Sequence, residues 1–263
     1  VKNSVTNTVS AEVISSEVDS GSLSVDAANT SVNRAISGAI AISEQAAAAV
    51  AVSVNDISNT VTARIAGNRF NGVDNGVSNI GDLVLVTANA SNKIETLAIG
   101  GGLAYGGETG GALAGSVGKT KICGDVEALI EEDENGDGAK IAADGSVGVG
   151  TRRDDYIGNV AGGLAVSLAP GLALAGAITV NDFDGKTRAG IYGADTEVSA
   201  KAETGKTAVR VALQDLNDSA KALGTSSNEL FDFRKFELKD KRATEENKAG
   251  EENKAGVVVN AAA

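Results

Sequence analysis

The chain has 263 residues and a formal net charge of −12, and 42% of its residues are hydrophobic but only 3% are aromatic. The excess of acidic residues disfavours nucleic acid as a partner, because phosphate binding relies on clustered Lys and Arg. The chain has no His and a single Cys, so an internal disulfide is excluded and the commonest general base is missing.

The first 18 residues alternate between apolar and polar side chains, with Val1, Val5, Val9 and Val13 on one face. This period of two predicts a half-buried β-strand. The strand belongs to an N-terminal segment, residues 1–22, that precedes the first repeat. We expect it either to cap the repeats or to pair with an exposed edge of another molecule.

A repeat follows. Residues 51–56 (AVSVND) return as residues 177–182 (AITVND), 126 positions later, and residues 114–117 (AGSV) lie midway, 63 positions from each. Downstream, residues 63–65 and 189–191 also differ by 126, whereas their middle counterpart, 128–130, is two residues late. A fixed period of this kind is typical of stacked architectures, in which each unit buries its apolar face against its neighbours.

Short strands rich in Val, Ala and Thr open each unit, at residues 23–33, 83–92 and 146–153, and a partial fourth opens at 197–203. The apolar residues are mainly Ala and Val, with 33 Gly and neither Trp nor Met, so we expect a thin, closely spaced core. The sequence therefore predicts an all-β domain over residues 23–224, built as a β-solenoid from repeats of about 61–63 residues. A β-sandwich or barrel is the alternative.

Residues 160–180 form a charge-free run of 21 residues, which is the length of a membrane span. The run contains four Gly and Pro170, and the equivalent segments of the other units contain Glu44 and Glu108. A spanning helix would not tolerate those residues well. We therefore predict a pair of buried strands joined at residues 169–171, and no membrane span.

The composition changes over residues 225–263. Phe231, Phe233 and Phe236 cluster in one short segment, which needs a cover: either this segment folds onto the last repeat as a cap, or it docks on a neighbouring subunit. Residues 245–250 then repeat at once as 251–256, a polar tract that we interpret as a flexible linker or a frayed helix.

One segment resembles a calcium-binding loop. Asp133, Asn135 and Asp137 occupy alternate positions before Gly138, and Asp144 stands at the twelfth position. Carboxylate and amide oxygens at this spacing suit Ca²⁺, whereas transition metals are disfavoured without His. Lys140 and the short side chain of Asp144 depart from the usual pattern. An ordinary acidic turn explains the same letters, so both interpretations stay open, and no other cofactor is expected.

The repeats (AVSVNDI, then TxAxI, then VxVxA strands) resemble those of large bacterial surface adhesins of the filamentous-haemagglutinin and leukotoxin-like kind, over about residues 20–205. The resemblance implies a right-handed β-helix that is secreted and displayed at the cell surface. We therefore expect a non-enzymatic extracellular structural protein, either a filament subunit that self-associates head to tail or an adhesin segment. Its partners would be further copies of itself and a host or neighbouring cell surface.

The alternative is a polysaccharide-acting β-helix enzyme. Such an enzyme needs a cleft with convergent Arg, Lys and Asp side chains. The sequence offers Arg152 and Arg153 beside Asp154 and Asp155, with nothing recurring opposite them, so no catalytic residue is assigned.

Overall fold

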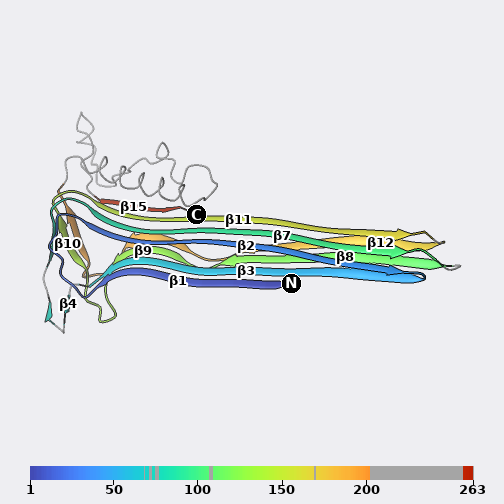
Figure 1. Cartoon of the computed structure of the whole chain (residues 1–263). Coiled ribbons are helices and arrows are strands. Elements are labelled where there is room, and N and C mark those ends of the chain that lie inside the picture. Colours follow the sequence, from blue (N-terminus) through green and yellow to red (C-terminus); the bar gives the residue numbers. More distant parts are fainter. Residues whose placement is uncertain are drawn as a thin grey trace, which may run out of the picture.

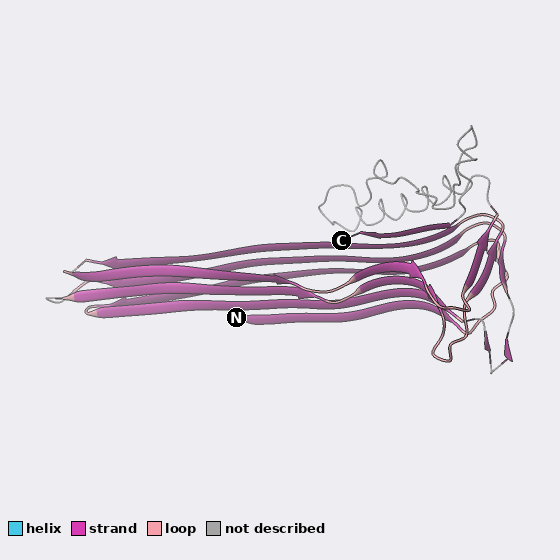
Figure 2. Ribbon diagram, turned by 180° about the vertical axis from the view of Figure 1, so that it is seen from behind, coloured by secondary structure: helices cyan, strands magenta, loops and turns pink. Residues whose placement is uncertain are grey.

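The computed structural model describes residues 1–67, 77–106, 109–168 and 170–201, together with the backbone of the strands β4 (Arg69–Phe70), β5 (Val73–Asp74) and β15 (Val257–Ala262). This part of the chain is all β, with long parallel strands in stacked parallel sheets (Figures 1 and 2). None of the described residues forms a helix long and apolar enough to cross a membrane.

Two long sheets face each other across the interior of the protein. Sheet C contains β2 (Leu23–Ser43), β7 (Val84–Ala104), β11 (Val147–Ser167) and β15, all parallel. Sheet A contains β1 (Lys2–Ile14), β3 (Ala46–Ala66), β8 (Gly110–Cys123) with β9 (Val126–Glu131), and β12 (Gly171–Phe183) with β13 (Thr187–Ile191). The chain passes from sheet C to sheet A at one end of the sheets, which we call the tip. The other end is the base.

Sheet B closes the base and consists of three short parallel strands, β6 (Ser78–Ile80), β10 (Lys140–Ala143) and β14 (Glu197–Ala200). Each repeat therefore contributes one strand to sheet C, one line of strands to sheet A and one short strand to sheet B. We call this set a rung. The longest strands have 21 residues, which at the usual rise per residue is about 70 Å.

The base has a conventional apolar core because sheet B holds sheets A and C apart there. Its fully buried side chains include Val61, Ile80, Val84, Ile130 and Val147. A smaller cluster of Ile57, Ile94 and Ile122 lies further toward the tip. Large apolar side chains therefore fill the space between sheets A and C only in the part nearest the base.

The tip has a different interior, lined by Ala, Gly and Ser. Ala47, Ala49, Ala112 and Ala114 are all buried there. A Cβ atom on Gly100 of sheet C would lie 2.1 Å from the carbonyl oxygen of Gly115 in sheet A. The two backbones are thus too close for any side chain at this position, and the expected thin core is confirmed in the tip.

The register corrects the predicted alignment of the repeats. Ala51 pairs with Ser116, and Ser116 with Ala177, so the spacings are 65 and 61 residues and not twice 63. In sheet C the first spacing is 61, from Leu23 to Val84. The connection between β7 and β8 is longer than that between β2 and β3, which adds the difference. The copy at residues 128–130, which is two residues late for a period of 63, is therefore the one that lies in the true register.

Two further predictions were wrong in part. Residues 160–180 do form two strands, β11 and β12, but the strands are not buried, because the described chain adds no rung beyond them at the tip. The segment at 197–203 does not open a fourth long strand. Its residues 197–200 form β14, which pairs with β10 in sheet B. The alternation in β1 and the starts of β2, β7 and β11 are confirmed within one residue.

Replacing Ala114 with Phe should destabilise the protein by about 1–3 kcal/mol or more, because the close sheets cannot absorb the added volume. Ala114 is 2% exposed. The matched control is Leu113→Phe, since Leu113 points outward on the same strand and is 49% exposed. Denaturant unfolding of both variants checks this, and equal losses of stability would contradict the thin interior.

Candidate functional site

Within the described residues, the two ends of the stack are open edges of sheet. At the first end, β1 pairs with β3 only from Val54 to Ala66, so the tip half of β3 and the whole of β2 have no strand on that side within the described chain. At the last end, β15 covers β11 only from Val147 to Arg152, and no described strand lies beyond β12 and β13. Unpaired strand edges of this length are templates for further strands.

The N-terminal strand lies on its own chain. Val5 packs against the Ile57 cluster, and Val9 and Val13 pack against the base core. Val1 is exposed, and its terminal amine donates a hydrogen bond to the carbonyl oxygen of Val52 at 2.7 Å. In this structure β1 therefore caps β3 and leaves its own outer edge open. The other residues predicted for assembly, Phe231, Phe233 and Phe236, lie outside the described residues.

At a level between the base and the tip, a line of polar side chains runs through the interior from rung to rung. Asn59 donates hydrogen bonds to Ser31 at 2.9 Å and to Asn92 at 2.6 Å. Asn92 in turn donates to Asp155 at 2.7 Å, and Asn7 of β1 donates to Ser31 at 3.2 Å. We call this line the polar ladder, and it runs from the first rung to the last.

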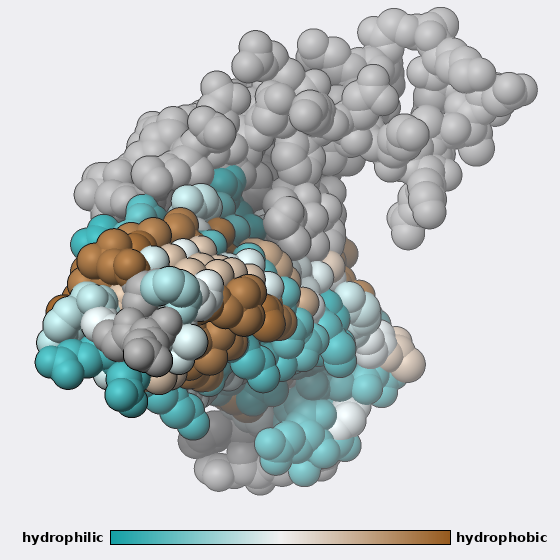
Figure 3. All heavy atoms as spheres, turned by 90° about the vertical axis from the view of Figure 1, so that its right-hand side faces the viewer, coloured by the Kyte–Doolittle hydropathy of each residue, from teal (hydrophilic) through white to brown (hydrophobic). Residues whose placement is uncertain are grey.

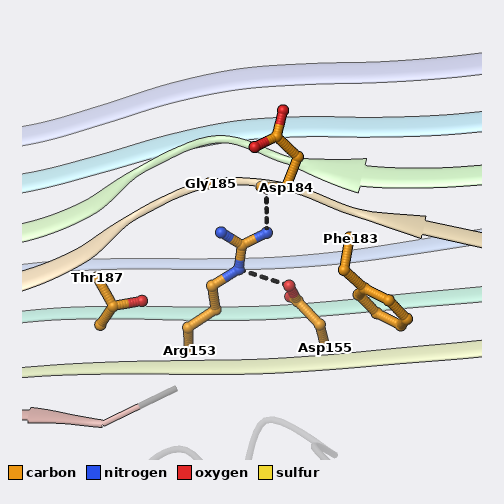
Figure 4. Close-up of a pocket in the computed structure, with 6 residues that line it drawn as sticks. All are labelled: Arg153, Asp155, Phe183, Asp184, Gly185 and Thr187. Carbon is orange, nitrogen blue, oxygen red and sulfur yellow. Dashed lines mark hydrogen bonds and ion pairs between the residues drawn. The ribbon is translucent and has the colours of Figure 1, made fainter.

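The ladder ends in a pocket at the open last rung (Figure 4). Arg153 extends from β11 toward sheet A and donates to the carbonyl oxygens of Gly124 at 2.7 Å and Asp184 at 2.9 Å. It also forms an ion pair with Asp155. The cavity has a volume of about 290 Å³, and Phe183 and Thr187 complete its lining. A further rung would close it.

Two glycines make room for Arg153. Gly124 and Gly185 lie between the two strand segments of their rungs, level with Asn59 and with positive φ angles of 114° and 133°. A Cβ on Gly124 would lie 1.9 Å from the carbonyl oxygen of Asn59. Sheet A therefore supplies no side chain here after Asn59, and the arginine of sheet C occupies that space.

Sequence reasoning noted Arg153 and Asp155 but did not place them in a ladder. The signal was present, because Ser31, Asn92 and Asp155 are register partners in consecutive strands. Their spacings of 61 and 63 residues are those of the repeat. Interior polar positions could have been found by aligning the strands at these spacings.

The residues predicted to bind calcium form an acidic turn in part. The Asp133 carboxylate accepts hydrogen bonds from the backbone amides of Asn135 at 2.8 Å and Asp137 at 3.1 Å, and from the Ser15 hydroxyl at 3.0 Å. Desolvation raises the pKa of Asp133, but these hydrogen bonds outweigh it and hold the pKa below its usual value. Both oxygens of this carboxylate are already used within the turn.

Asp144 does not join this turn. It follows β10, and its carboxylate forms an ion pair with Lys201 at 3.0 Å. Among the described residues, no three or more Cys, Asp or Glu side chains are grouped so as to hold a metal ion. Calcium binding by Asp133, Asn135, Asp137 and Asp144 stays a prediction.

Comparisons with known proteins found no family model, no curated protein and no solved structure that matches this chain.

Replacing Asn92 with Ala should lower the free energy of unfolding, because it removes a partner from both Asn59 and Asp155 inside the protein. Asn59 keeps its hydrogen bond to Ser31 and Asp155 keeps its ion pair with Arg153, so the cost is that of the hydrogen bonds removed, about 0.5–1.5 kcal/mol each. The control is Asn89→Ala, since Asn89 lies on the same strand but faces outward. Thermal and denaturant unfolding measure the difference, and similar effects of the two substitutions would show that the ladder adds no stability.

Acid should open the Asp133 turn. Because the folded pKa of Asp133 is lowered, its stabilising effect is present above the unfolded pKa and is lost as the pH falls through the folded pKa. Hydrogen exchange at the amides of Asn135 and Asp137 should therefore rise, relative to the rest of the chain, as the pH falls below about 4. In Asp133→Asn these amides should exchange faster already at neutral pH and lose this acid step. If the rise in exchange at low pH persists in this variant, a group other than Asp133 causes it.

Proposed function

We propose that the chain is a non-enzymatic extracellular structural protein whose stacked sheets form a right-handed β-solenoid, and that copies associate head to tail. The stacked parallel register and the short third sheet at the base support the solenoid. Right-handed connection is the strong preference wherever parallel strands of one sheet are joined by a crossover. The resemblance of the repeats to bacterial surface adhesins supports display at a cell surface, where a host or neighbouring cell is the partner.

The observation that carries the assembly is that parallel strands in one register form both edges of the described stack. At the last end β15 adds a short strand of six residues to sheet C, over the base portion of β11. At the first end β1 adds a half strand to sheet A, over the base portion of β3. When the last end of one copy meets the first end of the next, β15 and β1 lie opposite each other in one rung.

The register of this contact follows from the strands within one copy. Val9 of β1 is level with Val61, Val126 and Thr187 in successive rungs. The outer edge of β1 would therefore pair with β13 of the neighbouring copy, with Val9 opposite Thr187. The Arg153 pocket lies beside this junction and would be closed by it. Because the two ends are unlike and face opposite directions along the stack, such a contact propagates as a filament.

The enzyme alternative would place its site in the same pocket. There Asp155 accepts a hydrogen bond from Asn92 on one carboxylate oxygen and pairs with Arg153 through the other. A carboxylate held in this way has a structural role in the ladder, which favours the non-enzymatic proposal. Release of new chain ends from polyuronides or hexosamine polymers by the purified protein would support the alternative.

Ala189→Pro should stop elongation and leave a folded subunit. Lys186 and Tyr192 bond to sheet A through their backbone groups, so in the alternation of β13 the amide of Ala189 points to the open edge. Proline there removes an edge donor and no internal hydrogen bond. Light scattering and negative-stain imaging should show filaments of the original protein and none of this variant.

The control for this experiment is Ala194→Pro, in the exposed turn after β13, which should leave elongation unchanged. Circular dichroism checks that both variants are folded. The head-to-tail proposal fails if the original protein stays monomeric at high concentration. It also fails if filaments form equally well with proline at residue 189.

A further inference from the structure

The outer face of sheet C at the tip exposes large apolar side chains. Ile36 is 78% exposed, Ile40 is 83% exposed and Leu164 is 66% exposed. Figure 3 looks onto the tip and shows apolar surface on more than one side of it. Large contiguous apolar patches on a protein surface mark interaction sites.

The patch has a regular pattern, because β2, β7 and β11 are in parallel register. Across the three strands the outward positions form four rows. The two outer rows hold only large residues, and the two middle rows mix large residues with glycine. The rows are Ile36, Leu97 and Val160; Gly38, Ile99 and Gly162; Ile40, Gly101 and Leu164; and Ile42, Leu103 and Val166.

The glycines in the middle rows are not required by the molecule itself. A Cβ on Gly162 would meet nothing within 4 Å, and one on Gly38 would meet only a carbonyl oxygen at 3.9 Å. A Cβ on Gly101 would make ordinary van der Waals contact at 3.7 Å, and none of the three has a positive φ. Glycine weakens a strand relative to alanine, so its presence on an outer face indicates that another surface approaches closely here.

We propose that a second copy of this chain covers this face. A two-fold axis relates the two copies; it runs across the strands, reverses their direction and passes between the two middle rows. Each strand then faces its own counterpart. Gly38 faces Ile40 of the other copy, Ile99 faces Gly101, and Gly162 faces Leu164. Every glycine of the middle rows receives a large side chain, and every large side chain there meets a glycine.

Other two-fold arrangements of the same face lack this fit. An axis along the strands keeps each row opposite itself, so Gly38 faces Gly162 and Gly101 faces Gly101. Moving the strand-reversing axis by one residue along the strands, onto either middle row, also sets a glycine opposite its own copy. The complementary arrangement is thus a particular one, which gives the proposal a definite register.

The same axis brings opposite charges together at the border of the patch. Arg34 precedes the first row on β2, and Glu44 follows the last row in the turn at the tip. The axis places Arg34 of one copy, which also pairs with Glu95 of its own chain, opposite Glu44 of the other, and both side chains are exposed. On β11 it places Gly158 opposite Leu168, which is 70% exposed. Shape and charge therefore agree on one register.

A second copy fits this face better than a lipid bilayer does. Two such faces together would remove on the order of 1,000 Å² or more from water, which a stable protein interface requires. Hydrocarbon would need no glycine hollows. It would also leave the backbone edges of β2 and β11 unpaired, and open sheet edges do not occur in contact with lipid. This contact uses the side-chain face of sheet C and does not depend on the head-to-tail proposal.

Sedimentation of the full chain tests the pairing. The association should saturate at a closed dimer when the ends are blocked by Ala189→Pro, whereas stacking alone grows without limit and would leave this variant monomeric. Gly162→Leu should raise the dimer dissociation constant by at least about tenfold, because a leucine then faces Leu164. The matched control is Gly176→Leu, an outward glycine of β12 in sheet A that also has nothing within 4 Å of its Cβ position.

An exchange variant keeps the test decisive. In Gly162→Leu with Leu164→Gly the large residue and the hollow trade places in both copies, so dimerisation should return. Glu44→Arg should weaken the dimer, and adding Arg34→Glu should restore it. Circular dichroism confirms that each variant is folded.

Three results would overturn the proposal. The first is a monomer at all concentrations with the ends blocked. The second is equal weakening by Gly162→Leu and Gly176→Leu, or no recovery in the exchange variant. The third is binding of the monomer to phosphatidylcholine vesicles that Gly162→Leu leaves unchanged, which would assign the face to lipid.

Discussion

The close approach of sheets A and C at the tip determines where every other side chain of that region lies. With the Gly115 carbonyl oxygen 2.1 Å from where a Gly100 Cβ would stand, the interior admits only Gly, Ala and Ser along much of the tip. Residues alternate between the two faces of a strand, so the large apolar side chains of the same strands must point outward. The tip therefore reverses the usual arrangement of a folded protein, in which such residues are inside.

The base avoids this reversal because sheet B separates the two long sheets. Val and Ile fit between them, and their burial supplies most of the hydrophobic stabilisation of the fold. The polar ladder lies between the base core and the Ile57, Ile94 and Ile122 cluster. Asn7 and Asn59 of sheet A bond to Ser31 and Asn92 of sheet C, so a slip of one residue between the sheets would turn a ladder residue outward and leave a partner unpaired. The ladder thus helps to hold the rungs in register.

Much of this architecture could be predicted from the sequence, since the repeat, the strand starts and the thin core all follow from spacing and composition. The register of the middle repeat could not, because the longer connection between β7 and β8 has no periodic signal of its own. The exposure of residues 160–180 was missed for a physical reason. Apolar content normally predicts burial, but β11 and β12 form the last rung of the described stack at the tip, so no further strand covers them there.

The polar ladder and the glycine pattern share a second reason for being hard to predict. Both depend on which residues of different rungs lie beside each other. Those pairs can be identified only when the register of the strands is known. Arg153 is an example, because it reaches the backbone carbonyl oxygens of Gly124 and Asp184 through the space that the absent side chains of Gly124 and Gly185 leave in sheet A. A local motif search cannot find such a site.

The two proposed contacts are compatible because they act in perpendicular directions. Head-to-tail contact adds backbone hydrogen bonds along the stacking direction, whereas the face contact packs side chains across it. The two-fold axis of the face contact runs parallel to the stacking direction, so it leaves the order of the rungs unchanged. Two columns of copies could therefore lie face to face with the same polarity, and each copy would meet one partner in the other column. In such a pair the apolar face of sheet C at the tip is covered along the whole length, which the columns would not achieve separately.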